Sequence, residues 1–407
     1  MQSYTFGYGE NNSPTVTLQQ KTKLSIEMKR IIQFLLCFLA SILTVQSQET
    51  AQVVSKTFHS PDFPFDREIF IYTPPYYNER NQSEYDVVYV FDAQWRAEFA
   101  LTYGILEVCQ NMDVDADIFP FIVVGITSPT TPEYQRSNDF LPVPTNATYQ
   151  SNLYGNYENF KKFLREDVFT YINSHYRTSG HTLAIGHSLG ASFVLNALAS
   201  EDTFDDYIAL SPNFIEDNFK LADNFINYDF NNGKPHFLFL TMSNESEETG
   251  WPAEWRQGWD LVKSKMESAH IPESVRIFFK EYPHLTHMTC FVECLMDALP
   301  LYSMYRLNTT FNNDKLYPVH ITLDAPYAEG DVYITGNQES IINWNPMGLK
   351  MNKNEDNTYS IDLNLRLPAE FKFTQGSWES QIIPANACIG NLRIYSPEKT
   401  TKHYVAN

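Results

Sequence analysis

Short apolar runs recur along the first three quarters of the chain and define its pattern of secondary structure. Seven of them are four to six residues long and rich in β-branched or aromatic side chains, and helical patterns such as 159–174 and 191–199 lie between them. Strands buried on both faces are continuously apolar, so this alternation predicts a mostly parallel sheet covered by helices on both sides. The predicted strands are 68–72, 86–91, 121–126, 182–185, 207–210, 237–241 and 275–279.

The pattern changes after about residue 307. From Val319 onward the chain contains only short alternating runs punctuated by Asn, Gly and Pro, namely HITLDA, DVYITG, YSIDLNL, EFKFT and NLRIYS. Such runs are typical of an all-β, immunoglobulin-like sandwich. The sequence therefore predicts an α/β domain at 48–307, a linker at 308–314 and a sandwich domain at 315–407.

The first 47 residues have the features of an export signal. Lys29 and Arg30 follow Met28, an apolar stretch covers 31–45, and small residues suited to cleavage end near Ser47. The apolar stretch is shorter than the roughly 20 residues of a spanning helix, so we expect no transmembrane anchor after cleavage. The protein is predicted to be exported, either periplasmic or secreted, and residues 1–27 form an extension before the signal.

Charge and cysteine content narrow the class of protein. The chain of 407 residues has 49 acidic and 29 basic side chains and a formal charge of -20. This sign opposes phosphate backbones, so nucleic acid is not expected as a partner. The four cysteines beyond the signal show no framework spacing, which indicates that stability comes from packing.

The sequence Gly-His-Ser-Leu-Gly at 186–190 is the centre of the predicted chemistry. It follows a predicted strand and precedes a helical pattern, which is the context of a nucleophile elbow in an α/β-hydrolase fold. The glycines permit a sharp turn in which the serine backbone is strained. Ser188 is therefore the predicted nucleophile, and its chemistry requires no metal or cofactor.

A serine nucleophile needs a base, which in this fold class comes after the acid in the chain. His287 is the predicted base because it lies in the loop between the last predicted strand and the final helical run. His284 is interpreted as a surface or supporting residue. Together with Cys290 the two histidines resemble a metal-ligand spacing, but no further ligand group is evident.

Three carboxylates follow the predicted strand 237–241, where the acid loop is expected. Glu245 is nearest the strand end and is the preferred acid, Glu248 is next, and Glu247 lies between them. Two alternatives stay open. The segment is a solvated acidic loop, or the enzyme works with serine and histidine alone.

Tryptophans recur at every fourth position after this loop. Trp251, Trp255 and Trp259 would share one face of a helix. Such a stripe is compatible with core packing and equally with the wall of an acyl or sugar pocket. The sequence does not decide between the two.

Several longer segments match a known group of enzymes. They are REIFIYTPP, VVYVFDAQW, RSNDFLP, YRTSGHTLAIGHSLGASFVL and PHLTHMTC, and on them the stretch 58–306 resembles the esterase D or enterochelin-esterase-like group of α/β-hydrolases. The resemblance implies Ser188 as nucleophile, His287 as base and Glu245 as acid. It also implies that the backbone amides of Gln94 and Leu189 form the oxyanion hole.

The C-terminal part carries its own resemblance. The segments GNQESIINWNPMGLKM, YSIDLNLRLP and EFKFTQGSWES resemble starch- or glycogen-binding sandwich domains. The resemblance implies a glucan platform of Trp344, Lys372 and Trp378. The alternative is that these tryptophans pack in the sandwich and that the domain serves as a spacer.

Together these features predict a serine carboxylic-ester hydrolase that acts through an acyl-enzyme. The expected substrate is an acylated carbohydrate or a siderophore-type ester, and the sandwich is expected to bind a glucan polymer. Two alternatives remain at this stage. One is an acyltransferase with the same triad, and the other is a catalytically inactive carbohydrate-binding protein.

Overall fold

The computed structural model describes residues 50–111, 120–145, 153–201, 203–307, 314–388 and 390–406. Residues Thr50–Asn407 form one compact unit. The predicted extension and signal peptide, and nearly all of the linker 308–314, lie outside the described residues. The domain boundaries therefore stay predictions. Within the described part of the chain, no helix combines the length and apolar character that a membrane span requires.

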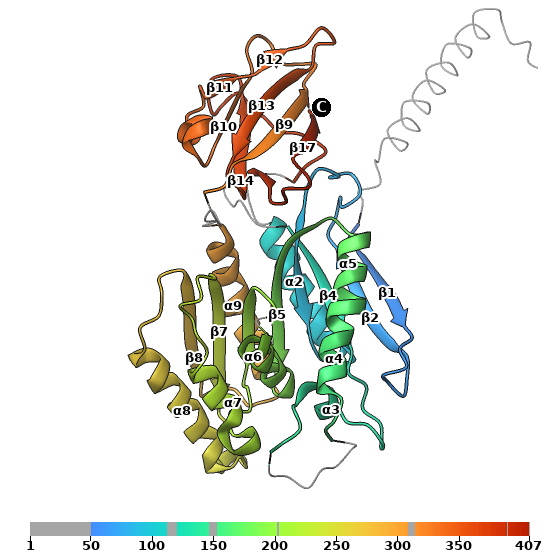
Figure 1. Ribbon diagram of the computed structural model, residues 1–407, viewed down its shortest axis with the longest axis vertical. Helices are drawn as coiled ribbons and strands as arrows, with labels where there is room; N and C mark the ends of the chain where they lie inside the picture. The colour runs from blue at the N-terminus through green and yellow to red at the C-terminus, as the bar shows by residue number, and fades with distance from the viewer. Residues whose placement is uncertain are drawn as a thin grey trace, which may run out of the picture. The chain divides into compact units, whose positions relative to one another are not determined.

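An eight-stranded sheet is the centre of the N-terminal part (Figure 1). Its strands pair in parallel except at one edge, where β1 and β2 run antiparallel to their neighbours. This arrangement confirms the predicted fold class. In spatial order the strands are β1 (Gln52–Phe58), β2 (Arg67–Thr73), β4 (Phe121–Ile126), β3 (Tyr85–Val90), β5 (Thr178–His187), β6 (Asp206–Leu210), β7 (His236–Ser243) and β8 (Val275–Tyr282).

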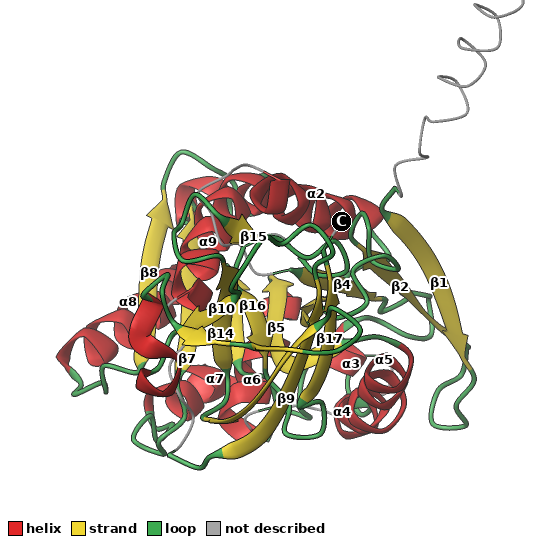
Figure 2. Cartoon of the chain, turned by 90° about the horizontal axis from the view of Figure 1, so that it is seen from above, coloured by secondary structure: helices red, strands yellow, loops and turns green. Residues whose placement is uncertain are grey.

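Helices cover both faces of this sheet, as Figure 2 shows from above. One hydrophobic cluster lies between the sheet and helices α2 (Arg96–Asn111) and α9 (Cys290–Leu307), and a larger one lies on the other face. Both clusters consist of fully buried aliphatic and aromatic side chains, which explains the continuous apolar runs in the strands. The second face carries α3 (Ser137–Phe140), α4 (Tyr157–Phe163), a π-helix (Leu164–Phe169), α5 (Thr170–His175), α6 (Leu189–Glu201), α7 (Glu216–Ile226) and α8 (Ala253–Ser268).

Two smaller sheets form the C-terminal part and enclose a core of their own. In one sheet, β14 (Ala369–Thr374) pairs with β10 (Tyr333–Gly336), β15 (Gln381–Ile382) and β16 (Leu392–Ile394). The short strand β11 (Leu349–Lys350) pairs with the other edge of β10. The predicted all-β region is thus present. The other sheet runs β12 (Asn352–Lys353), β13 (Tyr359–Leu365), β9 (Tyr317–Asp324) and β17 (Thr401–Val405).

The C-terminal part contacts the segment that leads into β3. Glu84 is buried, and its Oε1 lies 3.5 Å from Lys399 Nζ and 3.6 Å from Lys402 Nζ. The ammonium group of Lys399 also donates to the carbonyl oxygen of Thr178, the first residue of β5, at 3.4 Å. Since β3 and β5 are parallel neighbours, these contacts lie at the amino ends of two central strands.

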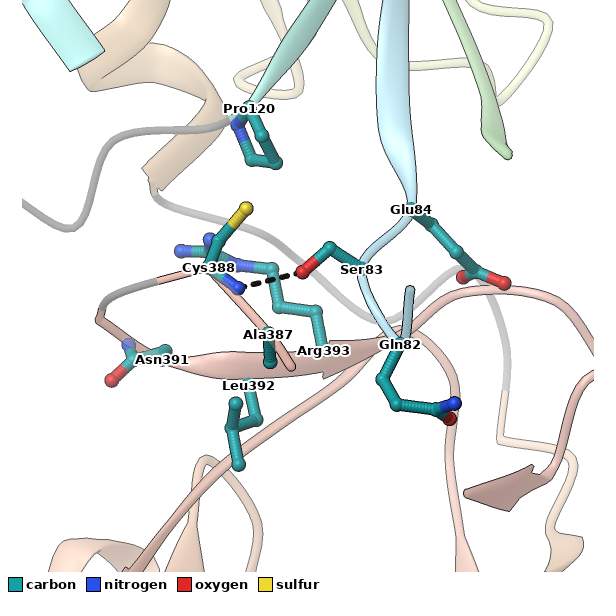
Figure 3. Close-up of a pocket in the computed structure, with 9 residues that line it drawn as sticks. All are labelled: Gln82, Ser83, Glu84, Pro120, Ala387, Cys388, Asn391, Leu392 and Arg393. Carbon is teal, nitrogen blue, oxygen red and sulfur yellow. Dashed lines mark hydrogen bonds between the residues drawn. The ribbon is translucent and has the colours of Figure 1, made fainter. Parts of the chain in front are cut away.

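A small pocket lies at this contact (Figure 3). Beside it the backbone amide of Cys388 donates to the hydroxyl of Ser83 at 2.7 Å. Polar and apolar side chains both line it, and they come from both parts of the chain. The residues are Gln82, Ser83, Glu84, Pro120, Ala387, Cys388, Asn391, Leu392 and Arg393.

Candidate active site

Ser188 occupies a sharp turn between β5 and α6. Its φ of 58° lies in the left-handed region, which costs a residue with a side chain about 1–3 kcal/mol. The turn is tight because Gly186 and Gly190 meet. A Cβ atom on Gly186 would lie 2.2 Å from the carbonyl oxygen of Gly190. The amide of Ser188 donates to the carbonyl of Leu210 at 2.9 Å, which fixes the turn to the end of β6.

His287 and Glu245 form a buried hydrogen-bonded pair. His287 Nδ1 lies 2.7 Å from Glu245 Oε1, and the two residues are only 6% and 1% exposed. Because an ionised carboxylate only accepts hydrogen bonds, Nδ1 carries the hydrogen and Nε2 is left to accept a proton. The other carboxylate oxygen accepts the amide of Ser243 at 3.0 Å. Glu247 and Glu248 are exposed, so of the three acids only Glu245 meets the histidine.

The turn of Ser188 and the loop of His287 are bonded to each other. His187 Nε2 lies 2.8 Å from the carbonyl oxygen of His287, and the two ring centroids are 4.8 Å apart. Among the described residues, neither Ser188 Oγ nor His287 Nε2 has a hydrogen-bond partner. Catalytic hydrogen bonds are often completed only when substrate is bound. The three predicted residues are therefore assembled at one edge of the sheet, with the serine–histidine bond unmade.

Two backbone amides at this edge are available as donors. In the part of the chain that the structure describes, the amides of Gln94 and Leu189 have no acceptor, whereas the amides of Ala93 and Trp95 both bond to backbone carbonyls. Leu189 begins α6, so its N–H is among those that a helix leaves unpaired and lies at the positive end of the helix dipole. These are the amides that the sequence resemblance assigned to the oxyanion hole.

Asp92 holds the segment that carries the Gln94 amide. Its carboxylate accepts Arg136 Nη1 at 2.6 Å and Gln94 Nε2 at 2.8 Å. Gln94 Oε1 in turn accepts the amide of Ser128 at 2.8 Å, so both ends of the Gln94 side chain are bonded. Burial raises the pKa of Asp92, and the charge of Arg136 opposes that rise. A Cβ on Gly190 would lie 3.0 Å from Asp92 Oδ2, which shows that this segment packs on the nucleophile turn.

The three tryptophans after the acid loop have different surroundings. Trp255 and Trp259 are buried, at 9% and 2% exposure, whereas Trp251 is half-buried. The Trp251 ring lies 4.4 Å from the His287 ring and 4.6 Å from the Trp255 ring, measured between centroids. Trp255 meets His287 edge-on at 5.8 Å and 84°. Trp259 thus belongs to the core, while the other two residues pack against the imidazole.

Sequence reasoning gave no role to His187 or Arg136. Both lie in segments that carried the resemblance, but their contacts depend on residues more than 40 positions away. His284, which the sequence left as a surface or supporting residue, is exposed and pairs with Glu293 at 3.0 Å. Across the described ranges, no cluster of three or more His, Cys, Asp or Glu side chains is arranged around a possible metal position.

The predicted sugar-binding residues lie around β14. Trp344 is half-buried at the end of a 3-10 turn, Lys372 lies in β14 opposite Thr335 of β10, and Trp378 is 42% exposed in the loop after β14. The loops that follow Trp344 and β14 are neighbours, since the hydroxyl of Thr374 donates to the carbonyl of Pro346. The structure therefore places Lys372 in β14 and Trp378 in the loop after it, with the segment that follows Trp344 bonded to the end of the same strand.

A mostly parallel sheet with serine after β5, acid after β7 and histidine after β8 defines the α/β-hydrolase class. The chain belongs to the family described as "Putative esterase", whose model matches residues 60–272. Membership of this family supports an enzyme that hydrolyses ester bonds. No curated protein sequence matches the chain.

Solved structures share the fold. An IroE-like serine hydrolase from Shewanella oneidensis is 21% identical with a TM-score of 0.51, covering 62% of this chain and 80% of that one. The siderophore hydrolase EstA from Aspergillus nidulans is 21% identical with a TM-score of 0.51, covering 63% and 95%. The BES protein from Bacillus cereus is 20% identical with a TM-score of 0.52, covering 64% and 98%. At these identities the likeness concerns the fold.

Proposed function

We propose that this protein is a serine carboxylic-ester hydrolase that works through an acyl-enzyme. The observation that carries the proposal is the buried pair of His287 and Glu245, 2.7 Å apart, bonded through the neighbouring His187 to the strained turn of Ser188. A turn with a purely structural role would not require a strained serine backbone. It would also not require a buried histidine that is oriented by a carboxylate.

In the first half-reaction Ser188 Oγ attacks the carbonyl carbon of the ester, and its proton passes to His287 Nε2. Glu245 accepts a hydrogen bond from Nδ1–H and stabilises the imidazolium that forms. The carbonyl oxygen becomes an oxyanion, which receives hydrogen bonds from the amides of Gln94 and Leu189. When the bond to the alcohol breaks, His287 donates its proton to the leaving oxygen, and Ser188 keeps the acyl group.

In the second half-reaction water attacks the acyl-enzyme. His287 takes a proton from the water, the same two amides hold the oxyanion, and the proton returns to Ser188 Oγ as the carboxylic acid leaves. The enzyme is restored with one ester bond broken and one water consumed. An acyltransferase would differ only in that a hydroxyl replaces the water, and its product would depend on an added acceptor.

Two substrate classes are supported by different observations. EstA, which shares the fold, is named as a siderophore hydrolase, and this favours a siderophore-type ester. The resemblance of the sandwich to glucan-binding domains favours an acylated carbohydrate. For the sandwich we propose glucan binding through Trp344, Lys372 and Trp378. Trp344→Ala and Trp378→Ala should lower retention on insoluble starch, whereas Tyr327→Ala, 81% exposed on the same part of the chain, should not.

We also propose that the protein is exported after cleavage near Ser47. N-terminal sequencing of the protein recovered from a producing cell tests this. A mature terminus at 48 or a neighbouring residue supports export, and a terminus at Met1 contradicts it.

The decisive experiment is labelling of the purified protein with a fluorophosphonate probe, together with hydrolysis of a short p-nitrophenyl ester. Wild type should be labelled and should turn over, and both signals should vanish in Ser188→Ala and His287→Ala. A folded wild-type protein that neither labels nor hydrolyses would contradict the enzyme and leave the inactive carbohydrate-binding protein as the better interpretation.

A further inference from the structure

A partly exposed tryptophan, Trp251, borders the candidate active site. Trp251 is only half-buried, although its ring lies 4.4 Å from the His287 ring and 4.6 Å from that of Trp255. Trp255 is buried behind it and meets the imidazole edge-on. The two indoles therefore differ. Trp255 supports the histidine from within the protein, and Trp251 also presents surface to the solvent.

The loop from Glu245 holds Trp251 in a defined place. The amide of Trp251 donates to the carbonyl of Ser246 at 3.0 Å. The side chains of Ser246 and Thr249 form a reciprocal capping box, and Gly250 turns the chain at a φ of 88°. Since Glu245 is itself bonded to His287, the loop fixes the indole relative to the imidazole. A surface held in this way loses little conformational entropy when it binds a ligand.

In the proposed reaction, the alcohol portion of the ester lies beside Trp251. His287 donates a proton to the oxygen of the departing alcohol, so it must contact that oxygen when the bond breaks. The alcohol group attached to the oxygen then lies next to the imidazole. Of the two tryptophans that contact the imidazole, Trp251 is the one that is partly exposed.

We infer that Trp251 forms a subsite for the alcohol portion of the ester, and that this alcohol is a neutral polyol with a flat apolar face, such as a sugar ring. The inference rests on the proposed esterase function. An indole offers a flat apolar surface to the C–H face of a sugar. Glu247, Glu248 and Glu254 are exposed close to Trp251 in the chain. Negative charge so close in the sequence disfavours an anionic alcohol, whereas a neutral polyol meets no such repulsion.

The test keeps the acyl group constant and varies the alcohol. Wild type, Trp251→Leu and Trp251→Phe are compared on methyl acetate and on a monoacetylated methyl glucoside. In Trp251→Leu we expect kcat/KM for the sugar ester to fall at least about tenfold further than kcat/KM for methyl acetate, so that the ratio of the two values reports recognition of the alcohol. Trp251→Phe, which retains a flat ring, should recover most of the loss. Thermal unfolding of both variants identifies any change in folding.

Each other outcome overturns the inference. An equal loss with both esters assigns Trp251 a role in placing His287 and none in recognising the alcohol. Equal activity of wild type and Trp251→Leu on both esters removes the residue from the site. A wild type that hydrolyses methyl acetate but leaves the sugar ester untouched rejects the polyol. Failure of the underlying function is distinguishable, because the wild type would then neither hydrolyse either ester nor react with the fluorophosphonate probe.

Discussion

His187 Nε2 lies 2.8 Å from the carbonyl oxygen of His287, so the residue before the nucleophile holds the loop of the base. Both residues are buried. An imidazole that donates through Nε2 satisfies this carbonyl and limits how far the loop can move. The distance between nucleophile and base thus depends on a side chain that takes no part in the proton transfers.

We predict that His187→Phe lowers kcat about ten- to a hundredfold, because small displacements of a catalytic group reduce the rate strongly. His187→Gln, which can still donate to the carbonyl, should retain more activity. The control is His284→Ala, which removes an exposed histidine from the loop that carries His287 and should change kcat less than about twofold. Equal activity of His187→Phe and His284→Ala would show that the hydrogen bond is dispensable.

Replacement of the acid distinguishes a triad from a serine–histidine pair. Glu245→Gln should reduce kcat about a hundredfold or more, because the amide no longer stabilises the imidazolium. Glu247→Gln and Glu248→Gln change exposed carboxylates of the same loop and should remain within about twofold of wild type. Steady-state hydrolysis of a p-nitrophenyl ester measures all three. Wild-type turnover by Glu245→Gln would favour the two-residue alternative.

The ion pair of Arg136 and Asp92 should contribute to stability as well as to the placement of Gln94. Arg136→Met leaves a buried carboxylate without its cation, and we expect the free energy of unfolding to fall by about 3 kcal/mol. Adding Asp92→Asn to Arg136→Met should restore part of the lost free energy of unfolding, because it removes the uncompensated charge. Urea denaturation of the two single variants and the double variant gives the coupling energy. Additive effects would mean that the pair is not coupled.

Glu98 in the first turn of α2 gives a pH-dependent prediction. Its Oε2 is buried and has no hydrogen-bond partner among the described residues. Burial, reinforced by the charge of Asp92, raises the pKa of Glu98 from 4.5 to about 7. The folded state therefore holds this proton at pH values where the unfolded chain has released it. Stability from this group is complete below pH 4.5 and is lost as the pH rises to about 7.

Glu98→Gln removes this dependence. Relative to wild type, the variant should gain stability between pH 4.5 and pH 7, by no more than about 3 kcal/mol because the residue is half-buried. Urea denaturation of both proteins at pH 5 and pH 8 measures the difference. The same difference at both pH values would show that Glu98 does not titrate in this range.

The parallel strands could be predicted because burial on both faces leaves a continuous apolar run in the sequence. β1 could not, because its sequence QVVSKTF has neither a continuous apolar run nor a regular alternation, and most of the strand is exposed at the sheet edge. The predicted helix 159–174 is continuous in space, but its middle turn is a π-helix that apolar spacing does not reveal.

The parts of the candidate site that depend on residues close together in the chain could be predicted from the sequence. The turn around Ser188 depends on two glycines within five residues. The choice among Glu245, Glu247 and Glu248 depends instead on which carboxylate meets a histidine about forty positions later. The contact of His187 with the His287 carbonyl spans 100 positions and leaves no local signal.

The contacts of the C-terminal part lie at the amino ends of β3 and β5, whereas Gln94 and Ser188 follow the carboxyl ends of the same strands. The six residues of β3 alone span about 20 Å. The sandwich, which is proposed to hold a polymer, therefore contacts the α/β part at the end of these strands opposite Ser188. Polymer binding by the sandwich would raise the effective concentration of neighbouring esters at Ser188. The same binding would not change the hydrolysis of a soluble monomeric ester.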